Sequence, residues 1–171
     1  QLYLHNRRNP DETTKVTIFI AALTYSDYFY AEGMTECDIR NWIRVNNNAL
    51  AYFGGVTPTV TPDNCKVAVA RNSPVLNKDF QAWAEHNNTV LTPAKVKSPR
   101  WKPVVEGHVK IITMHILMDM EDMVFYSLDD LNCVLMEKVD AENRKPFEGL
   151  TYSRYDLFTT EEKETLLPLP P

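Results

Sequence analysis

The chain has 171 residues, with 18 Lys and Arg against 23 Asp and Glu, a net charge of -5, and 44% hydrophobic residues. This composition is typical of one ordinary soluble globular domain and excludes a collagen-like or disordered chain. The longest apolar stretches, 16–23 and 111–118, are shorter than the roughly 20 residues that a membrane span needs. The three cysteines are widely spaced and form no Cys-x-x-Cys pair, which argues against a disulfide framework and favours a reducing cytoplasm.

The first third of the chain has the pattern of three strands followed by a helix. The second strand is apolar on both alternating faces, which predicts a central position in a sheet. Thr35 and Asp38 form a capping box that predicts the start of a helix, and Gly54 predicts its end. The three strand patterns lie at 2–4, 15–24 and 28–32.

Short strands and helices alternate in the rest of the chain. Apolar spacing predicts a long helix from about Lys102 to Met120, and Ser127 with Asp130 predicts the cap of a last helix. The proline-rich end is expected to be extended and loosely held. The remaining patterns are strands at 56–61 and 89–93 and a helix at 77–87.

This order of elements predicts an α/β fold. Three antiparallel strands precede two parallel strands that are joined by helical crossovers, which gives a mixed five-stranded sheet with helices on its faces. We expect this domain to cover residues 1–145 and the C-terminal extension to cover 146–171.

The charge of the chain is unevenly distributed. Basic side chains dominate the segment 95–110, where Glu106 is the one acidic residue. A phosphate-sized anion would be drawn to this segment, although a solvated loop has the same composition. The basic residues are Lys95, Lys97, Arg100, Lys102 and Lys110.

Two carboxylates beside this basic segment are candidates for metal ligands. Asp63 follows the predicted strand 56–61, and Glu106 lies near the start of the long helix. Oxygen ligands of this kind suit magnesium acting on a phosphodiester. Asp63 could instead form a turn, and Glu106 could pair with the lysines one turn away on either side.

Several strings in the sequence resemble one enzyme family. Thr61-Pro62-Asp63-Asn64 and Lys102-Pro103-Val104-Val105-Glu106 resemble the second and third acidic positions of the DDE catalytic core of retroviral integrases and transposases. The strings at 22–28, 51–56, 62–66 and 98–107 are similar to the IstA-type transposases of insertion sequences, and the similarity covers nearly the whole chain.

The resemblance implies an RNase H-like fold and a bacterial polynucleotidyl transferase. Such an enzyme cleaves transposon DNA ends and transfers the 3'-hydroxyl to target DNA, using two Mg²⁺ or Mn²⁺ ions roughly 4 Å apart. Asp63 and Glu106 would be catalytic metal ligands, and the first carboxylate would lie upstream of Gln1. We therefore expect the chain alone to be inactive.

The resemblance also implies DNA contacts and protein partners. Lys95, Lys97, Arg100 and Lys102 would follow the DNA phosphates. Lys110 would contact the DNA end or pair with Glu106, and Asn64 would orient DNA or cap a turn. The full protein would self-associate and cooperate with an ATPase helper in the bacterial cytoplasm. We expect it to bind no membrane.

Two other functions are compatible with the same residues. One is a non-catalytic DNA-binding or assembly module that keeps the RNase H-like fold after losing its chemistry. The other is a structure-selective nuclease of the same fold, which would cut DNA without joining it.

Overall fold

The computed structural model describes residues 1–62, 77–92, 110 and 112–171. The chain divides into two compact units. The first contains residues 1–36 and 103–158, and the second contains residues 37–102 and 159–171. Each unit is described by itself below.

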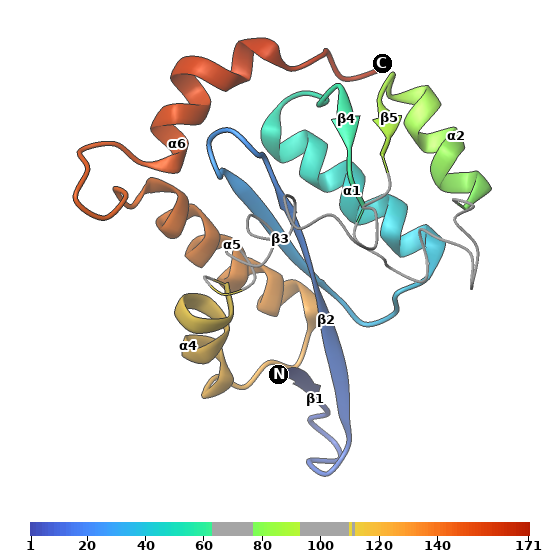
Figure 1. The fold of residues 1–171 in the computed structure, drawn as a ribbon. Helices are drawn as coiled ribbons and strands as arrows, with labels where there is room; N and C mark the ends of the chain where they lie inside the picture. Colours follow the sequence, from blue (N-terminus) through green and yellow to red (C-terminus); the bar gives the residue numbers. More distant parts are fainter. Residues whose placement is uncertain (63–76, 93–109, 111) are drawn as a thin grey trace, which may run out of the picture. The chain divides into compact units, whose positions relative to one another are not determined.

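The first unit contains an antiparallel sheet, which Figure 1 shows in blue. Its strands are β1 (Leu2–His5), β2 (Thr13–Ala22) and β3 (Phe29–Met34), and β2 lies between the other two. The predicted meander and the central position of its second strand are therefore confirmed. Leu2 pairs with Val16 and Ile20 with Ala31.

Helix α5 (Leu128–Arg144) packs against this sheet and supplies one wall of the core. Ser127 caps it, as predicted, by accepting a hydrogen bond from the Asp130 N–H at 3.1 Å. Fully burying a leucine-sized side chain contributes about 1.5–3 kcal/mol, so the buried apolar face of α5 is a main source of stability. The buried residues of the cluster include Leu131, Leu135 and Val139 from α5, with Phe29, Ile116, Met120 and Phe125.

Two asparagines of α5 bind the backbone of β3. The Asn143 amide donates to the Phe29 carbonyl at 2.8 Å and accepts from the Phe29 N–H at 3.2 Å. Asn132 makes the same pair of bonds with Gly33, at 3.1 and 2.6 Å. Gly33 leaves room for this approach, since a Cβ there would lie 2.7 Å from Val16 Cγ1.

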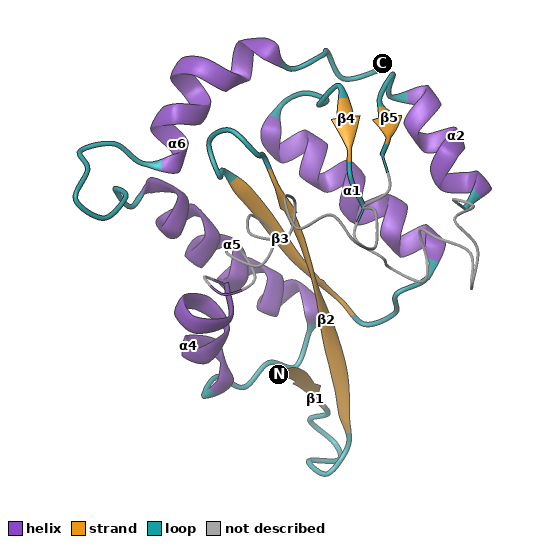
Figure 2. Cartoon of the chain, in the orientation of Figure 1, coloured by secondary structure: helices purple, strands orange, loops and turns teal. Residues whose placement is uncertain are grey.

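The predicted long helix is seen over its second half. Lys110 is helical, η1 (Ile112–Leu117) is π-helical, and α4 (Met118–Glu121) ends one residue after the predicted position. The predicted start near Lys102 lies outside the described residues. Figure 2 shows α4 and α5 as separate helices.

Three short helical segments follow α5 and were not predicted. The segments are α6 (Arg154–Leu157), η2 (Phe158–Glu162) and η3 (Lys163–Thr165). A capping box starts α6, because the Ser153 and Asp156 side chains each accept a hydrogen bond from the other residue's backbone. Arg154 is buried beside them, with its guanidinium 4.0 Å from Glu142 and over the Phe147 ring.

The second unit contains α1 (Ile39–Phe53), β4 (Thr59–Val60), α2 (Lys78–His86) and β5 (Val90–Leu91). Asp38, not the predicted Thr35, caps α1, since its side chain accepts from the Asn41 N–H at 2.8 Å. Gly54 ends the helix as predicted, with a φ of 76° that favours glycine.

The C-terminal segment is held at Leu167, where the expectation of a loose end is wrong. Leu167 and Val56 exchange two backbone hydrogen bonds, each 2.8 Å long. This approach depends on the neighbouring glycine, since a Cβ on Gly55 would lie 2.7 Å from Leu166 Cβ and 2.9 Å from the Leu167 carbonyl oxygen. The segment is extended, as predicted, but it is paired.

The structure contains both antiparallel and parallel strand pairs, as predicted. β4 and β5 are parallel, with Thr59 opposite Val90 and Val60 opposite Leu91. In the part of the chain that the structure describes, the antiparallel and parallel strands form a three-stranded and a two-stranded sheet.

Candidate active site at the carboxyl ends of β4 and β5

The carboxyl ends of β4 and β5 lie side by side because the two strands are parallel. Backbone hydrogen bonds join them from the Val90 N–H to the Pro58 carbonyl at 3.1 Å, and from the Thr92 N–H to the Val60 carbonyl at 2.9 Å. The Thr61 and Thr92 hydroxyls, one residue beyond each strand, lie 2.9 Å apart. The two chain segments therefore leave the sheet at the same edge.

The predicted ligand and DNA-contact residues follow these two strand ends in the sequence. Pro62 is buried and immediately precedes Asp63, whereas Thr92 precedes the basic segment. Parallel pairing thus brings Thr61 and Thr92, which precede these two segments in the sequence, to one sheet edge. The predicted site residues that lie outside the described residues are Asp63, Asn64, Lys95, Lys97, Arg100, Lys102 and Glu106.

Lys110 is the one predicted site residue that the structure describes. It is helical and its side chain is exposed. Because Glu106 lies outside the described residues, the pairing between these two side chains stays a prediction. The exposure of Lys110 is compatible with either proposed role, a DNA contact or an ion pair with Glu106.

No competing metal site is found in the described part of the chain. Residues 1–62, 77–92, 110 and 112–171 contain no group of three or more His, Cys, Asp and Glu side chains that could hold an ion. The metal-binding role of the carboxylate pair stays a prediction, because Asp63 and Glu106 lie outside the described residues.

Helix α2 packs against α1 through aromatic side chains. Phe80 is fully buried, stacks on Trp83 at 5.1 Å between ring centres, and meets Trp42 of α1 edge-on at 5.8 Å. Trp83 Nε1 also donates to Asn47 Oδ1 at 2.6 Å. Both tryptophans are core residues, and neither offers an exposed face for stacking on a base.

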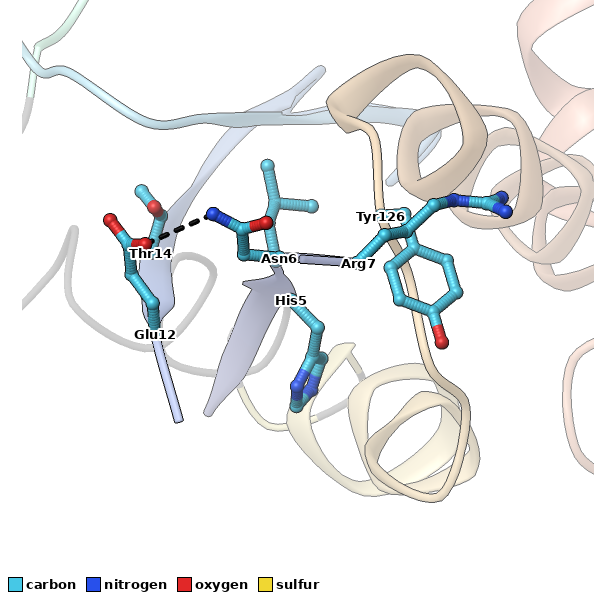
Figure 3. A pocket seen from close by; sticks show the side chains of 7 residues that line it. His5, Asn6, Arg7, Glu12, Thr14 and Tyr126 are labelled. Atoms are coloured by element: carbon cyan, nitrogen blue, oxygen red, sulfur yellow. Dashed lines mark hydrogen bonds between the residues drawn. The ribbon is translucent and has the colours of Figure 1, made fainter. Parts of the chain in front are cut away.

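An open hollow of about 320 Å³ lies beside the hairpin between β1 and β2 (Figure 3). Two pairs of its lining side chains interact with each other. The Asn6 amide donates to Glu12 at 3.0 Å, and the Arg7 guanidinium lies 4.4 Å from the centre of the Tyr126 ring. None of the predicted site residues lines the hollow, and the described residues around it include no group of three or more metal ligands, so we do not assign the reaction to it.

The two threonines that join the strand ends were not predicted from the sequence. Thr61 and Thr92 are ordinary β-formers beside prolines, so neither residue stands out alone. The available signal was their equivalent position: each follows a short strand and precedes a proline.

Among the helices that the structure describes, none has the length and apolarity needed to cross a membrane.

Solved structures define the class of fold. The catalytic core domain of BIV integrase matches 95% of this chain and 93% of its own, with a TM-score of 0.68 and 14% identity. A chain of the simian T-cell lymphotropic virus intasome, solved with a PP2A regulatory subunit, matches 99% of this chain and 55% of its own, with a TM-score of 0.70 and 15% identity. The fold is therefore that of an integrase catalytic core, which is RNase H-like, as predicted.

Sequence comparison identifies the relatives more narrowly. A Sinorhizobium fredii protein named as a transposase is 35% identical over 90% of the chain, and a Pseudomonas fluorescens protein named as the transposase for insertion sequence IS1162 is 34% identical over 93%. The IS21 transposase of Pseudomonas aeruginosa is 27% identical over 91%. No protein-family model matches the chain. The chain is a homologue of insertion-sequence transposases, and it spans 30% of the length of the first relative and 29% of the second.

Proposed function

We propose that this chain is the catalytic core of a DDE transposase, a polynucleotidyl transferase that cuts transposon DNA ends and joins them to target DNA. The observation that carries the proposal is its similarity, over about nine-tenths of its length, to insertion-sequence transposases. The parallel β4–β5 pair adds support, since it brings Thr61 and Thr92, which precede the Asp63 segment and the basic segment in the sequence, to one sheet edge. In this proposal the core covers 1–145 and the extension 146–171.

Asp63 and Glu106 would hold divalent ions, Mg²⁺ or Mn²⁺, with a third carboxylate upstream of Gln1. Carboxylate oxygens are the ligands that these hard cations prefer. When bound, the ions would activate the attacking oxygen and stabilise the leaving oxygen.

The reaction would consist of two balanced substitutions at phosphorus. In cleavage, a water oxygen bonds to the phosphorus at the transposon end while the bond to the 3'-oxygen breaks, leaving a free 3'-hydroxyl. In joining, that 3'-oxygen bonds to a target phosphorus while a target 3'-oxygen leaves. Joining replaces one phosphodiester with another, so it needs no nucleotide as an energy source.

The DNA would lie along the basic segment. Lys95, Lys97, Arg100 and Lys102 would neutralise phosphates, which gives binding a strong dependence on salt. Lys110 would contact the DNA end, and Asn64 would orient DNA beside Asp63. By family resemblance, the full protein would self-associate on paired DNA ends, work with an ATPase helper and act in the bacterial cytoplasm.

The experiment is a cleavage and joining assay on the full-length gene product that contains this chain, with marked transposon-end and target DNA. We expect both activities to require Mg²⁺ or Mn²⁺ and to be lost in Asp63→Asn and Glu106→Gln. Glu85→Gln changes an exposed carboxylate of α2 and should leave both activities intact. Cleavage without joining would identify a nuclease, and DNA binding without either reaction would identify an assembly module.

A further inference from the structure

The hairpin of β1 and β2 turns one face to the core and the other to solvent. Leu2 and Val16 pair across the two strands, and both are buried. Tyr3 and Lys15 form the next pair, so their side chains lie on the opposite face, and both are exposed. We call this outer surface the ribbon face. It consists of Tyr3 and His5 of β1 with Thr13, Lys15 and Thr17 of β2.

The ribbon face is polar and contains no carboxylate, although the chain has 23 Asp and Glu. Each of its side chains carries a group that can donate a hydrogen bond, and Lys15 carries a positive charge. The Tyr3 hydroxyl already donates to Gln1 Oε1 at 2.7 Å. The face is therefore suited to an anionic ligand that accepts hydrogen bonds.

The loop between the two strands adds two arginines. Arg7 and Arg8 are both exposed, and neither forms an ion pair with another residue that the structure describes. The Arg7 guanidinium lies 4.4 Å from the centre of the Tyr126 ring (Figure 3). This contact with the ring holds the guanidinium in place without neutralising its charge.

The two carboxylates of the hairpin, Asp11 and Glu12, lie in the same loop. Residues 2–17 still carry one more positive than negative charge, in a chain whose net charge is -5. The Asn6 N–H donates to the Glu12 carbonyl at 3.2 Å, which continues the strand pairing into the loop. Because Asn6 and Glu12 fall in the same alternation as Leu2 and Val16, the Glu12 carboxylate lies on the side away from the ribbon face.

The hairpin end of β2 extends beyond β3. Thr17 is the first residue of β2 that pairs with β3, whereas 13–16 pair with β1 (Figure 1). The ribbon face and the loop are thus exposed on a part of the sheet that β3 does not reach. Arginine, lysine, threonine and tyrosine side chains all bind DNA phosphates, and the planar guanidinium can bind two phosphate oxygens at once.

We propose that the β1–β2 hairpin is a further DNA-contact surface, on which Arg7, Arg8 and Lys15 neutralise backbone phosphates. This inference rests on the proposed function, in which the protein acts on DNA. Phosphate contacts carry no sequence information, so transposon-end and target DNA offer the hairpin the same chemistry.

The test measures DNA binding by the full-length gene product at several salt concentrations, by fluorescence anisotropy with a labelled transposon-end duplex and an unrelated target duplex. Each phosphate contact contributes about 0.9 to the slope of log K against log salt. We expect Arg7→Ala/Arg8→Ala to reduce the slope by about 2, and Lys15→Ala to reduce it by about 1, with at least one duplex. Arg7→Lys/Arg8→Lys keeps the charge and should keep the wild-type slope.

Helix α1 offers a matched control for the double variant. Arg40 and Arg44 are exposed and lie one turn apart on α1. Arg40→Ala/Arg44→Ala removes the same charge from the protein outside the hairpin and should keep the wild-type slope. An equal reduction in this variant would overturn the proposal, because the loss would then follow net charge alone.

The remaining outcomes identify the ligand. A reduced slope with one duplex alone supports the proposal and assigns the hairpin to that DNA. Wild-type slopes with both duplexes in the alanine variants of the hairpin overturn it. If such variants also lose self-association in sedimentation, the hairpin is a protein-docking surface instead.

Failure of this inference is distinguishable from failure of the proposed function. If the wild-type protein binds DNA but neither cuts nor joins it, the proposed catalytic function fails, and the slope still decides the hairpin contact. If it cuts and joins DNA while the hairpin variants keep the wild-type slope, only the hairpin contact is overturned. A wild-type protein that binds neither duplex would overturn both.

Discussion

Asn143 of α5 satisfies both backbone polar groups of Phe29 on β3, donating to its carbonyl at 2.8 Å and accepting from its N–H at 3.2 Å. Asn132, about three helical turns earlier, does the same for Gly33. β3 is an edge strand of the described antiparallel sheet. The two amides occupy backbone groups that an edge strand would otherwise offer to another chain.

Asn143→Ala should therefore destabilise the first unit. Asn143 is only 1% exposed, so the variant leaves the Phe29 N–H and carbonyl buried without their partner. A buried unsatisfied polar group costs about 1–3 kcal/mol, and we expect a loss of about 2–4 kcal/mol in the free energy of unfolding, measured by urea denaturation.

The control for this variant is Glu137→Ala, which changes an exposed residue of the same helix. It should alter stability by less than about 0.5 kcal/mol. Equal effects of the two variants would show that the clamp on β3 contributes nothing specific.

Gly55→Ala should release the C-terminal segment from Val56. The new methyl group would meet Leu166 Cβ at 2.7 Å and the Leu167 carbonyl oxygen at 2.9 Å, so the two backbone bonds between Val56 and Leu167 could not both persist. Hydrogen exchange should then be faster at the Val56 and Leu167 amides.

Gly54→Ala provides the comparison, because the same change is made one residue earlier. A Cβ there meets nothing within 4 Å, but the φ of 76° disfavours alanine. We expect it to destabilise the end of α1 by about 1 kcal/mol and to leave the Leu167 amide protected. Loss of protection in Gly54→Ala alone would contradict the steric account of Gly55.

Lys110→Ala should weaken binding of the full-length gene product to transposon-end DNA and reduce its salt dependence. Losing one phosphate contact lowers the slope of log K against log salt by about 1. Lys145→Ala removes the same charge from another exposed position and should keep the wild-type slope. If both variants keep that slope, Lys110 does not contact a phosphate.

The helix ends that the sequence predicted are those whose signals are local. Gly54, Asn77 and Ser127 each act on backbone groups within a few residues, so the sequence pattern alone locates them. The start of α1 was misplaced because Thr35 and Asp38 are both good caps, three residues apart. The structure selects Asp38, whose carboxylate binds the Asn41 N–H.

Features that depend on distant partners were missed. The Val56–Leu167 pairing joins residues far apart in the chain, and no local pattern encodes it. Asn143 did leave a signal, because it continues the spacing of four residues set by Leu135 and Val139, where a buried apolar side chain is expected. An asparagine at such a position indicates a specific buried partner.

The strand pairing beside the candidate site was predictable from the order of elements, but its side-chain contacts were not. Two short strands separated by a helix predicted parallel pairing, which β4 and β5 confirm. The bridge between Thr61 and Thr92 could not be predicted, because it depends on the register of that pair.

The joint binding of one metal centre by Asp63 and Glu106 is tested most directly by metal-directed cleavage of the polypeptide. Fe²⁺ replaces Mg²⁺ in the full-length gene product, ascorbate and peroxide generate hydroxyl radicals at the bound ion, and mass spectrometry maps the cuts. The account predicts cuts near both residue 63 and residue 106, and loss of both sets in Asp63→Asn. Cuts near only one of the two residues, or cuts near 106 that persist in Asp63→Asn, would contradict it.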